Sequence, residues 1–384
     1  MPQNISMKKI HPNRIRRIRT WIHGHGKAEL IDSNTKSPPL LDLASNDYLS
    51  LNRHPKLIEA IQETIYLEGV GAGGSRLITG SRPIHSKLET ALANWLGRKK
   101  VLLFPSGFQA NIAAVQVLAK RHAPVITDRL IHHSLLVGIK ASGAKLYRYS
   151  HNDLDDLEKQ LKLCSQKHPN QSPIVITESL FSMEGTSPNL KLLAQICKNY
   201  GGKLLVDEAH ALGVMGPGGK GLSYGLSSSI AIVVGTFGKA FGSGGAFLAS
   251  DQTIGEDLIQ TSGAFRYTTA LAPPLASAAL AALELIKENP NWGTELQEKA
   301  NDWRNHLQAN GWECPPGNGP IIPLIMGSEQ KALTLQKQLE SRGFLTVAIR
   351  PPTVPEGKSR LRLVLQRNLP IGTLNKLLVA LNAS

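Results

Sequence analysis

The sequence has 384 residues, of which 41% are hydrophobic, and 43 Lys and Arg against 29 Asp and Glu give a formal net charge of +14. This length and apolar content predict a large domain with a sizeable core plus a smaller domain, and no apolar run approaches the length of a membrane span. The charge favours anionic substrates such as phosphates, carboxylates or a coenzyme A-like thioester. Nucleic-acid binding is less favoured, because aromatic residues are few and no Lys/Arg run is long.

The first part of the chain predicts a basic amphipathic helix over 1–23. Residues 1–27 contain no acidic side chain, and five apolar residues could line one face of such a helix: Ile10, Ile15, Ile18, Trp21 and Ile22. An Arg-rich, acid-poor start is also typical of a transit peptide, but the helix is the interpretation we favour. The three cysteines are not spaced like metal ligands, and we find no signal peptide, so we expect a cytoplasmic location.

A glycine-rich stretch follows a helical pattern over 54–68. Residues 69–81 read GVGAGGSRLITGS, which is neither a dinucleotide fingerprint nor a phosphate-binding P-loop. Two interpretations stay open: a plain flexible loop, or backbone that lines the floor of an active site.

Strands alternate with helices from 101 to 249, which predicts a mostly parallel sheet covered by helices on both faces. Ser106-Gly107-Phe108 follows the strand 101–104 and opens a helix. Free N–H groups and a positive dipole at a helix N-terminus bind anions, so we expect a cofactor phosphate there. An ordinary helix cap is the simpler alternative. His132 and His133 follow the strand at 124–128, where an imidazole could stack on a ring and handle a proton.

The stretches KLLVDEAH (203–210) and GTFGK (235–239) carry the strongest chemical signal. An apolar strand delivers Asp207 to its carboxyl end, where ligands bind in open α/β sheets. Lys239 lies on tight turns between apolar runs at 230–234 and 246–249. A lone Gly-Lys is most simply a solvated loop lysine, but pyridoxal phosphate chemistry needs this pair. The amine forms a Schiff base and the carboxylate keeps the pyridine nitrogen protonated, and the pair resembles the signature of fold-type I pyridoxal-phosphate enzymes.

The composition and pattern of the sequence change after residue 250. A long Ala/Leu-rich helix over 275–288 is predicted to join two domains, and a strand over 359–365 and a helix over 369–381 close the chain. We therefore divide the chain into an N-terminal helix and extended segment (1–50), a large cofactor-binding domain (51–275) and a small C-terminal domain (276–384).

The ordered set of motifs resembles the α-oxoamine synthase family, from about residue 10 to the C-terminus. The motifs are NDYL, SGF, DRLIH, ESLFSMEG, DEAH and TFGK, at 46–49, 106–108, 128–132, 178–185, 207–210 and 236–239. Each motif alone is weak, but the set in this order is specific. RPPTVP (350–355) and RLR (360–362) are similar to the branch that joins alanine to a pimeloyl thioester in biotin synthesis.

The resemblance implies pyridoxal 5′-phosphate as cofactor, no metal, and a homodimer with active sites at the subunit interface. Lys239 would bind the cofactor covalently, Asp207 would pair with its ring nitrogen, and His210 would bond its phenolic oxygen. His132, rather than His133, would stack on the ring and assist proton transfer. Ser182 would lie beside the ring, and Gly107, Phe108 and Thr236 would bind the phosphate. Thr268 (or Thr269) would reach the phosphate bound in the partner subunit.

The implied substrate contacts are His132, Asn46, Thr353 and Arg362, with Arg362 at the amino-acid carboxylate. An N-terminal arginine would contact the acyl substrate; Arg16, Arg17 and Arg19 compete, and we choose Arg17. Ala211 follows His210 where relatives often carry Gly or Ser.

The resemblance implies a transferase that condenses L-alanine with pimeloyl-CoA or pimeloyl-acyl carrier protein. The products would be 8-amino-7-oxononanoate, CO2 and a free thiol, with no nucleic-acid or membrane partner. The alternative within the family is a glycine-using enzyme such as 2-amino-3-ketobutyrate CoA ligase, or a 5-aminolevulinate or sphingoid-base synthase. A non-enzymatic, basic nucleic-acid-binding protein is a distant alternative, as is a degenerate structural member of the fold.

Overall fold

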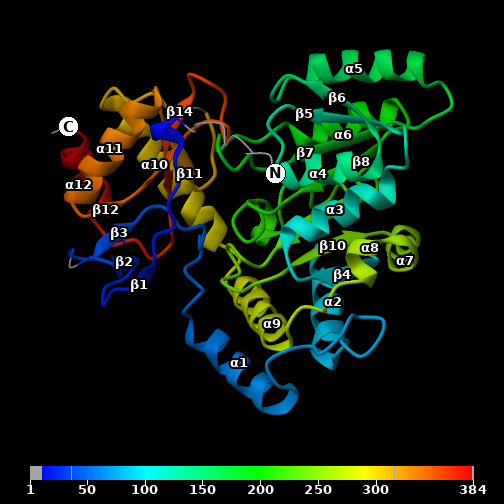
Figure 1. The fold of residues 1–384 in the computed structure, drawn as a ribbon, viewed down its shortest axis with the longest axis horizontal. Helices are drawn as coiled ribbons and strands as arrows, with labels where there is room; N and C mark the ends of the chain where they lie inside the picture. The colour runs from blue at the N-terminus through cyan, green and yellow to red at the C-terminus, as the bar shows by residue number, and fades with distance from the viewer. Residues whose placement is uncertain (1–10, 36, 315, 383–384) are drawn as a thin grey trace, which may run out of the picture.

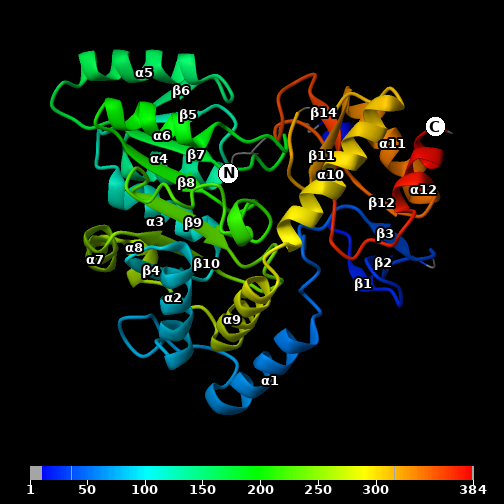
Figure 2. The same ribbon diagram turned by 180° about the vertical axis from the view of Figure 1, so that it is seen from behind.

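The structure is a computed structural model that describes residues 11–382 apart from 36 and 315. Within these residues, two lobes lie side by side, one built on a large sheet and the other on two small sheets (Figure 1). The view from behind shows the same division, with α9 (Pro273–Glu288) beneath the large sheet and α10 (Trp292–Ala309) in the other lobe (Figure 2).

The large sheet has the order β4-β10-β9-β8-β7-β5-β6. Pairing is parallel from β9 to β6, whereas β10 runs antiparallel to both β4 and β9. The predicted mostly parallel sheet is therefore confirmed. Its strands are β4 (Lys100–Phe104), β5 (Pro124–Asp128), β6 (Lys145–Tyr149), β7 (Ile174–Glu178), β8 (Lys203–Asp207), β9 (Ile232–Thr236) and β10 (Ala246–Ser250).

Side chains alternate between the two faces of this sheet, and each face has its own core. In β8, Leu204 and Val206 join one core, whereas Leu205 joins the other. Short strands of branched apolar residues suit a sheet buried on both faces. The first core packs against α2 (Pro83–Leu96), α5 (Leu154–Lys167), α6 (Leu190–Asn199) and α9, and the second against α3 (Gly107–Leu118), α4 (His133–Ser142), α7 (Gln252–Thr261) and α8 (Gly263–Arg266).

The smaller lobe contains two sheets. One has the order β11-β14-β13 and the other the order β1-β2-β3-β12, so N-terminal strands pair with a C-terminal strand. This lobe also contains α10, α11 (Glu329–Ser341) and α12 (Thr373–Asn382). The predicted domain bounds stay a prediction. The strands are β1 (Trp21–His23), β2 (Glu29–Asp32), β3 (Leu40–Asp42), β11 (Ile321–Gly327), β12 (Phe344–Leu345), β13 (Val347–Ile349) and β14 (Ser359–Val364).

The predicted N-terminal helix is wrong over 11–23. A short 3₁₀ turn, η1 (Pro12–Arg14), leads into extended chain and then β1, and Ile18 is 98% exposed. Arg19 binds Asp32 at 3.0 Å and Glu340 at 2.7 Å, and β1 pairs with β2. These long-range partners override the weak local periodicity, while Ile10 and the rest of 1–10 lie outside the described residues.

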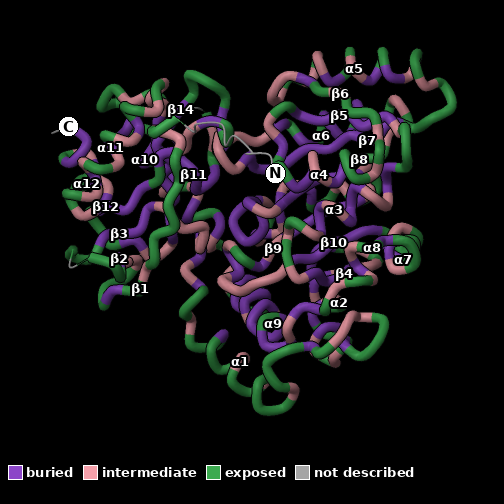
Figure 3. Tube along the Cα trace, viewed as in Figure 1, coloured by how far each residue is buried: buried purple, intermediate pink, exposed green. Residues whose placement is uncertain are grey.

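Helix α1 (Pro55–Glu68) lies at the edge of the first core, which it joins through Leu57 and Ile61. Among its residues only Leu57 is buried, and the helix is mostly exposed in Figure 3. It projects from the body of the large lobe, next to α9 (Figure 1). None of the described helices is long and apolar enough to cross a bilayer.

Candidate active site

A cavity of about 150 Å³ lies at the carboxyl ends of β7, β8 and β9, the edge where parallel sheets bind ligands. The residues predicted from the sequence that line it are Gly107, Phe108, His132, Asp207, His210, Thr236 and Lys239. The sequence-derived site residues nearest the expected cofactor thus meet at one place. Asn111 and Glu178 also line the cavity, although the sequence had given them no role.

A hydrogen-bond network connects Asp207 to His132. Asn111 Nδ2 donates to Asp207 Oδ2 at 2.7 Å and to Ser134 Oγ at 2.9 Å, and Ser134 Oγ lies 2.6 Å from His132 Nδ1. The backbone N–H of Ala209 donates to Asp207 Oδ1 at 2.9 Å. Both oxygens of Asp207 therefore accept from N–H donors, which fixes the orientation of the carboxylate.

Lys239 lines the same cavity and is half-buried. Burial lowers the pKa of its amine to about 8, although the Asp207 carboxylate acts in the opposite direction. The charge of Arg362 lowers the pKa further, so this guanidinium lies close enough to act on the amine. A lysine with such a pKa has a substantial neutral fraction near neutral pH and can act as nucleophile or base.

The N-terminus of α3 forms the opposite wall of the cavity. Ser106 caps the helix by accepting from Gln109 N at 3.3 Å, and Gly107 and Phe108 follow it. The first N–H groups of a helix have no partner within the helix. They give this wall the donors that an anionic group needs, and Thr236, whose hydroxyl donates to the Gly245 backbone oxygen at 3.0 Å, also lines the cavity.

Arg362 reaches the site from β14 in the smaller lobe. Its Nε donates to the backbone oxygen of Ser182 at 2.7 Å and its Nη2 to Asn46 Oδ1 at 2.9 Å. Asn46 and Arg362 are thus brought together, although neither is among the residues that line the cavity, and their predicted roles as substrate contacts stay predictions. Ser182 contacts Arg362 through its backbone and is not among the residues that line the cavity, so its predicted place beside the ring stays a prediction.

The predicted acyl-substrate residues lie around a second cavity of about 450 Å³, between the N-terminal segment and the smaller lobe. Arg16, Arg17, Arg19, Arg350 and Thr353 all line it. Arg16, rather than Arg17, hydrogen-bonds Thr353, at 3.0 Å. The choice of Arg17 stays a prediction, and this contact makes Arg16 its strongest competitor.

Thr268 lies outside the cavity and is half-buried. Its hydroxyl donates to the backbone oxygen of Thr269 at 3.4 Å, and Thr269 forms an isolated bridge with Ser75. Within this chain Thr268 therefore does not reach the site, as a role in a partner subunit requires.

Two of the functional residues that sequence reasoning missed, Asn111 and Glu178, have polar atoms without partners. Asn111 Oδ1 and Glu178 Oε1 are buried and accept no hydrogen bond from the described residues. An asparagine on the buried side of the apolar helix α3, and a glutamate that ends the apolar strand β7, were the available signals. These atoms indicate that the cavity holds a polar ligand.

Glu178 carries a testable charge state. It is the cross-strand partner of Asp207, and burial together with the Asp207 charge raises the pKa of Glu178 well above its usual range. When the pKa of a carboxyl group is higher in the folded than in the unfolded protein, the protein becomes less stable as the pH rises from the unfolded-state pKa towards the folded-state pKa. We therefore expect Glu178→Gln, which is neutral at every pH, to gain stability over wild type as the pH rises from 5 to 8, as measured by thermal unfolding of the apoprotein.

The control for Glu178 is Glu184→Gln. Glu184 pairs with Arg360 at 3.1 Å, so its replacement leaves a buried guanidinium without its partner. Burial raises the pKa of Glu184 as well, so this variant shares the pH trend, but we expect the loss of the Arg360 partner to keep its unfolding temperature below that of wild type at pH 8. A Glu178→Gln protein that is less stable than wild type at pH 8 would contradict the neutral assignment.

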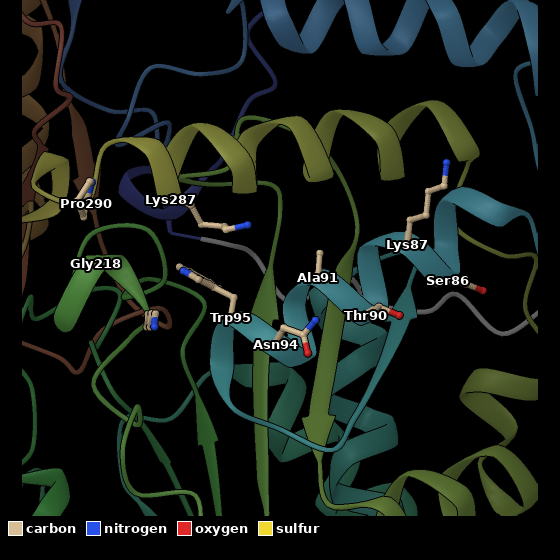
Figure 4. A pocket seen from close by; sticks show the side chains of 10 residues that line it. Ser86, Lys87, Thr90, Ala91, Asn94, Trp95, Gly218, Lys287 and Pro290 are labelled. Atoms are coloured by element: carbon tan, nitrogen blue, oxygen red, sulfur yellow. The ribbon is translucent and has the colours of Figure 1, made fainter.

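A larger cavity of about 880 Å³ lies elsewhere, between α2, α9 and the turn at Gly218 (Figure 4). Its lining includes Lys87, Trp95 and Lys287 but none of the residues predicted from the sequence. Among the described residues, no group of three or more His, Cys, Asp or Glu side chains could hold a metal ion.

Comparisons with known proteins agree with this constellation. The pattern of the family described as aminotransferase class I and II matches residues 38–381. An 8-amino-7-oxononanoate synthase from Saccharophagus degradans is 40% identical over 357 residues, which cover 92% of this chain and 88% of the relative.

Solved structures share the fold. A serine palmitoyltransferase from Sphingomonas wittichii has a TM-score of 0.89 at 25% identity, over 95% of this chain and 91% of that one. An 8-amino-7-oxononanoate synthase from Francisella tularensis has a TM-score of 0.76 at 30% identity, over 89% and 96%. A structure of a serine palmitoyltransferase with bound pyridoxal phosphate also superposes, with a TM-score of 0.89 at 25% identity, over 95% and 92%.

Proposed function

The chain belongs to the aminotransferase class I and II family, alongside 8-amino-7-oxononanoate synthases, and on this premise we propose that it condenses L-alanine with a pimeloyl thioester. Its cofactor is pyridoxal 5′-phosphate. The observation that carries the proposal is the meeting of Lys239, Asp207, His132 and His210 in one cavity of a chain 40% identical to such a synthase. The proposal includes a cytoplasmic location, which its free, buried cysteines fit.

The residues around the cavity fit this cofactor. A buried amine with a lowered pKa, a carboxylate held by Asn111, and a helix N-terminus lie on its walls. They match the aldehyde, the ring nitrogen and the phosphate in turn. Lys239, Asp207, and Gly107 with Phe108 and Thr236 would hold these three groups.

The cofactor, when bound, supplies an aldehyde that joins amines and a ring that delocalises electrons. Lys239 Nζ would take the proton from the α-carbon of alanine and return a proton to the product. Asp207 would keep the ring nitrogen protonated, and Arg362 with Asn46 would bind the alanine carboxylate. The α-carbon forms a bond to the thioester carbonyl as the C–S bond breaks, and the carboxylate leaves as CO2.

The arginine-lined second cavity would receive the acyl substrate. A pimeloyl group has a carboxylate at its far end, and Arg16, Arg17, Arg19 and Arg350 line this cavity. We therefore place the acyl chain between the two cavities, with Thr353 at its side.

The test is a product assay with matched amino acids and thioesters. We expect 8-amino-7-oxononanoate, detected by mass spectrometry, from L-alanine with pimeloyl-CoA or pimeloyl-acyl carrier protein, and far less product from glycine or serine. The TM-scores of 0.89 with serine palmitoyltransferases favour serine with palmitoyl-CoA as the second candidate. Turnover with that pair alone would reject the proposal in favour of a sphingoid-base synthase.

The proposal includes a homodimer formed through the face that carries α1. Tyr66, Leu67, Val70, Ile78 and Tyr267 are between 74% and 90% exposed. The Ser75–Thr269 bridge brings the loop at 69–81, with Val70 and Ile78, close to the segment that carries Tyr267. Apolar groups gathered in this way are typical of a subunit interface. The same face carries Thr268, which a partner subunit could use.

We expect Ile78→Lys to convert the dimer to a monomer in light-scattering measurements, because burial of an unpaired ammonium group opposes association. The matched control is Ile371→Lys, since Ile371 is 104% exposed and lies in the smaller lobe. This control protein should remain dimeric. A dimer that persists in Ile78→Lys would place the interface elsewhere.

The lowered pKa of Lys239 predicts how cofactor binding depends on pH. Only the neutral amine attacks an aldehyde, and its pKa is about 8 in the apoprotein. The rate constant for binding of pyridoxal 5′-phosphate to apoprotein should therefore rise with pH and level off above about 8. Stopped-flow absorbance measures this rate, and N-acetyl-lysine, whose side-chain pKa is about 10.4, provides the solvent-exposed reference. A profile that keeps rising in parallel with the reference would contradict the lowered pKa.

A further inference from the structure

Tyr48 and His210 form a buried hydrogen bond beside the cofactor cavity. The Tyr48 oxygen lies 2.6 Å from His210 Nδ1, and Tyr48 is fully buried. The ring centroids are 6.2 Å apart with an interplanar angle of 57°, so the rings are tilted rather than stacked. The oxygen–nitrogen bond is therefore the contact that fixes the orientation of the imidazole.

Both partners are electrically neutral. Burial raises the pKa of Tyr48 to about 12, although Arg362 acts in the opposite direction through its charge and a hydrogen bond. Burial lowers the pKa of His210 well below its usual range, and the charges of Lys239, Arg362 and His132 lower it further. A neutral imidazole carries one proton, on either Nδ1 or Nε2.

The surroundings of Tyr48 decide which nitrogen carries that proton. If His210 donated from Nδ1, the Tyr48 hydroxyl would have to donate to Asn46 Oδ1, which lies 3.3 Å away. That distance exceeds the usual range for an O–H···O bond, and Asn46 Oδ1 already accepts from Arg362 at 2.9 Å. His210 Nδ1 lies only 2.6 Å from the Tyr48 oxygen, well inside the range, so Tyr48 directs its own proton towards Nδ1.

We propose that Tyr48 locks His210 in the tautomer protonated at Nε2, so that a neutral imidazole presents an N–H donor to the cofactor. His210 lines the cavity, and no hydrogen bond between described residues engages Nε2. The proposal rests on the proposed function in one respect, namely that the acceptor is the phenolic oxygen of the cofactor. Tyr48 is thus a positioning residue that acts through His210.

The proposal predicts a shift in the spectrum of the holoenzyme. An N–H donor withdraws negative charge from the phenolic oxygen, which then supports the proton on the neighbouring cofactor–lysine nitrogen less well. Removal of the Tyr48 hydroxyl weakens this donor. The midpoint of the pH-dependent visible absorbance should therefore rise by about one pH unit in Tyr48→Phe, and cofactor retention should fall about tenfold, the size of one hydrogen bond.

The chain offers a matched control for this variant. Tyr147 also contacts a histidine through its hydroxyl, at 3.0 Å from His168 Nε2, but neither residue lines the cavity. Tyr147→Phe should leave the absorbance midpoint unchanged. An unchanged midpoint in Tyr48→Phe, a fall, or an equal rise in both variants would overturn the proposal.

The tautomer itself can be read without cofactor or turnover. In ¹⁵N-histidine-labelled apoprotein, the His210 signals are those that disappear in His210→Asn. We expect a protonated Nε2 and an unprotonated Nδ1, and a protonated Nδ1 would overturn the proposal even if Tyr48→Phe fails to fold. Neither readout uses alanine or an acyl thioester, so a failed product assay would reject the proposed function and leave this test intact.

Discussion

Lys239→Ala should abolish both covalent attachment of the cofactor and turnover. Lys239 is the buried amine of the cavity, and its pKa of about 8 suits a nucleophile and base. A positioned acid–base group alone contributes up to about 10⁴-fold to a rate, so the loss of product formation should be at least of that order. Borohydride reduction followed by mass spectrometry should place the cofactor on residue 239 of the wild type and nowhere in the variant.

The variant Lys239→Arg tests whether Lys239 acts through its positive charge or through proton transfer. A guanidinium retains its charge in proteins and cannot act as a base near neutral pH, so this variant should be as inactive as the alanine variant. The control Lys287→Ala removes an exposed amine that pairs with Glu284 at 3.1 Å, far from Lys239 along the chain, and should retain activity. Wild-type turnover in either Lys239 variant would show that another group forms the anchor and the base.

The sequence predicts the sheet well because its strands carry their own signal. The strands β7 and β8 are short runs of branched apolar residues that end in a carboxylate, and this pattern places Asp207 at the ligand-binding edge without knowledge of the tertiary structure. The glycine-rich turn after β9 likewise predicts the position of Lys239. Local pattern and global fold agree at these positions.

Other features depend on partners that are distant in sequence. The N-terminal segment is extended because β1 pairs with β2 and Arg19 binds Glu340, which no local periodicity reveals. The Tyr48–His210 bond joins residues 162 apart. Asn111 and Glu178 are recognised as site residues only through their contacts with Asp207. Asn111 donates a hydrogen bond to Asp207, and Glu178 is its cross-strand neighbour.

Asp207→Asn should remove most of the turnover but leave the cofactor attached to Lys239. The Asn111 amide and the Ala209 N–H both donate to Asp207, so the NH₂ of an asparagine would face a donor and the charge that holds the ring nitrogen would be lost. Removal of one preorganised electrostatic group costs about 10²–10³-fold in kcat. Borohydride fixation should still label residue 239, which distinguishes this loss from that of Lys239→Ala.

The decisive comparison is between neighbouring carboxyl groups. Glu178 and Asp207 are cross-strand partners that line the same cavity, yet burial raises the pKa of Glu178 well above its usual range, whereas Asn111 donates a hydrogen bond to Asp207. An uncharged amide resembles a neutral acid and not a carboxylate, so Glu178→Gln should keep most of the kcat that Asp207→Asn loses. The reverse order of kcat values would place the negative charge on Glu178, and with it the group that holds the cofactor ring.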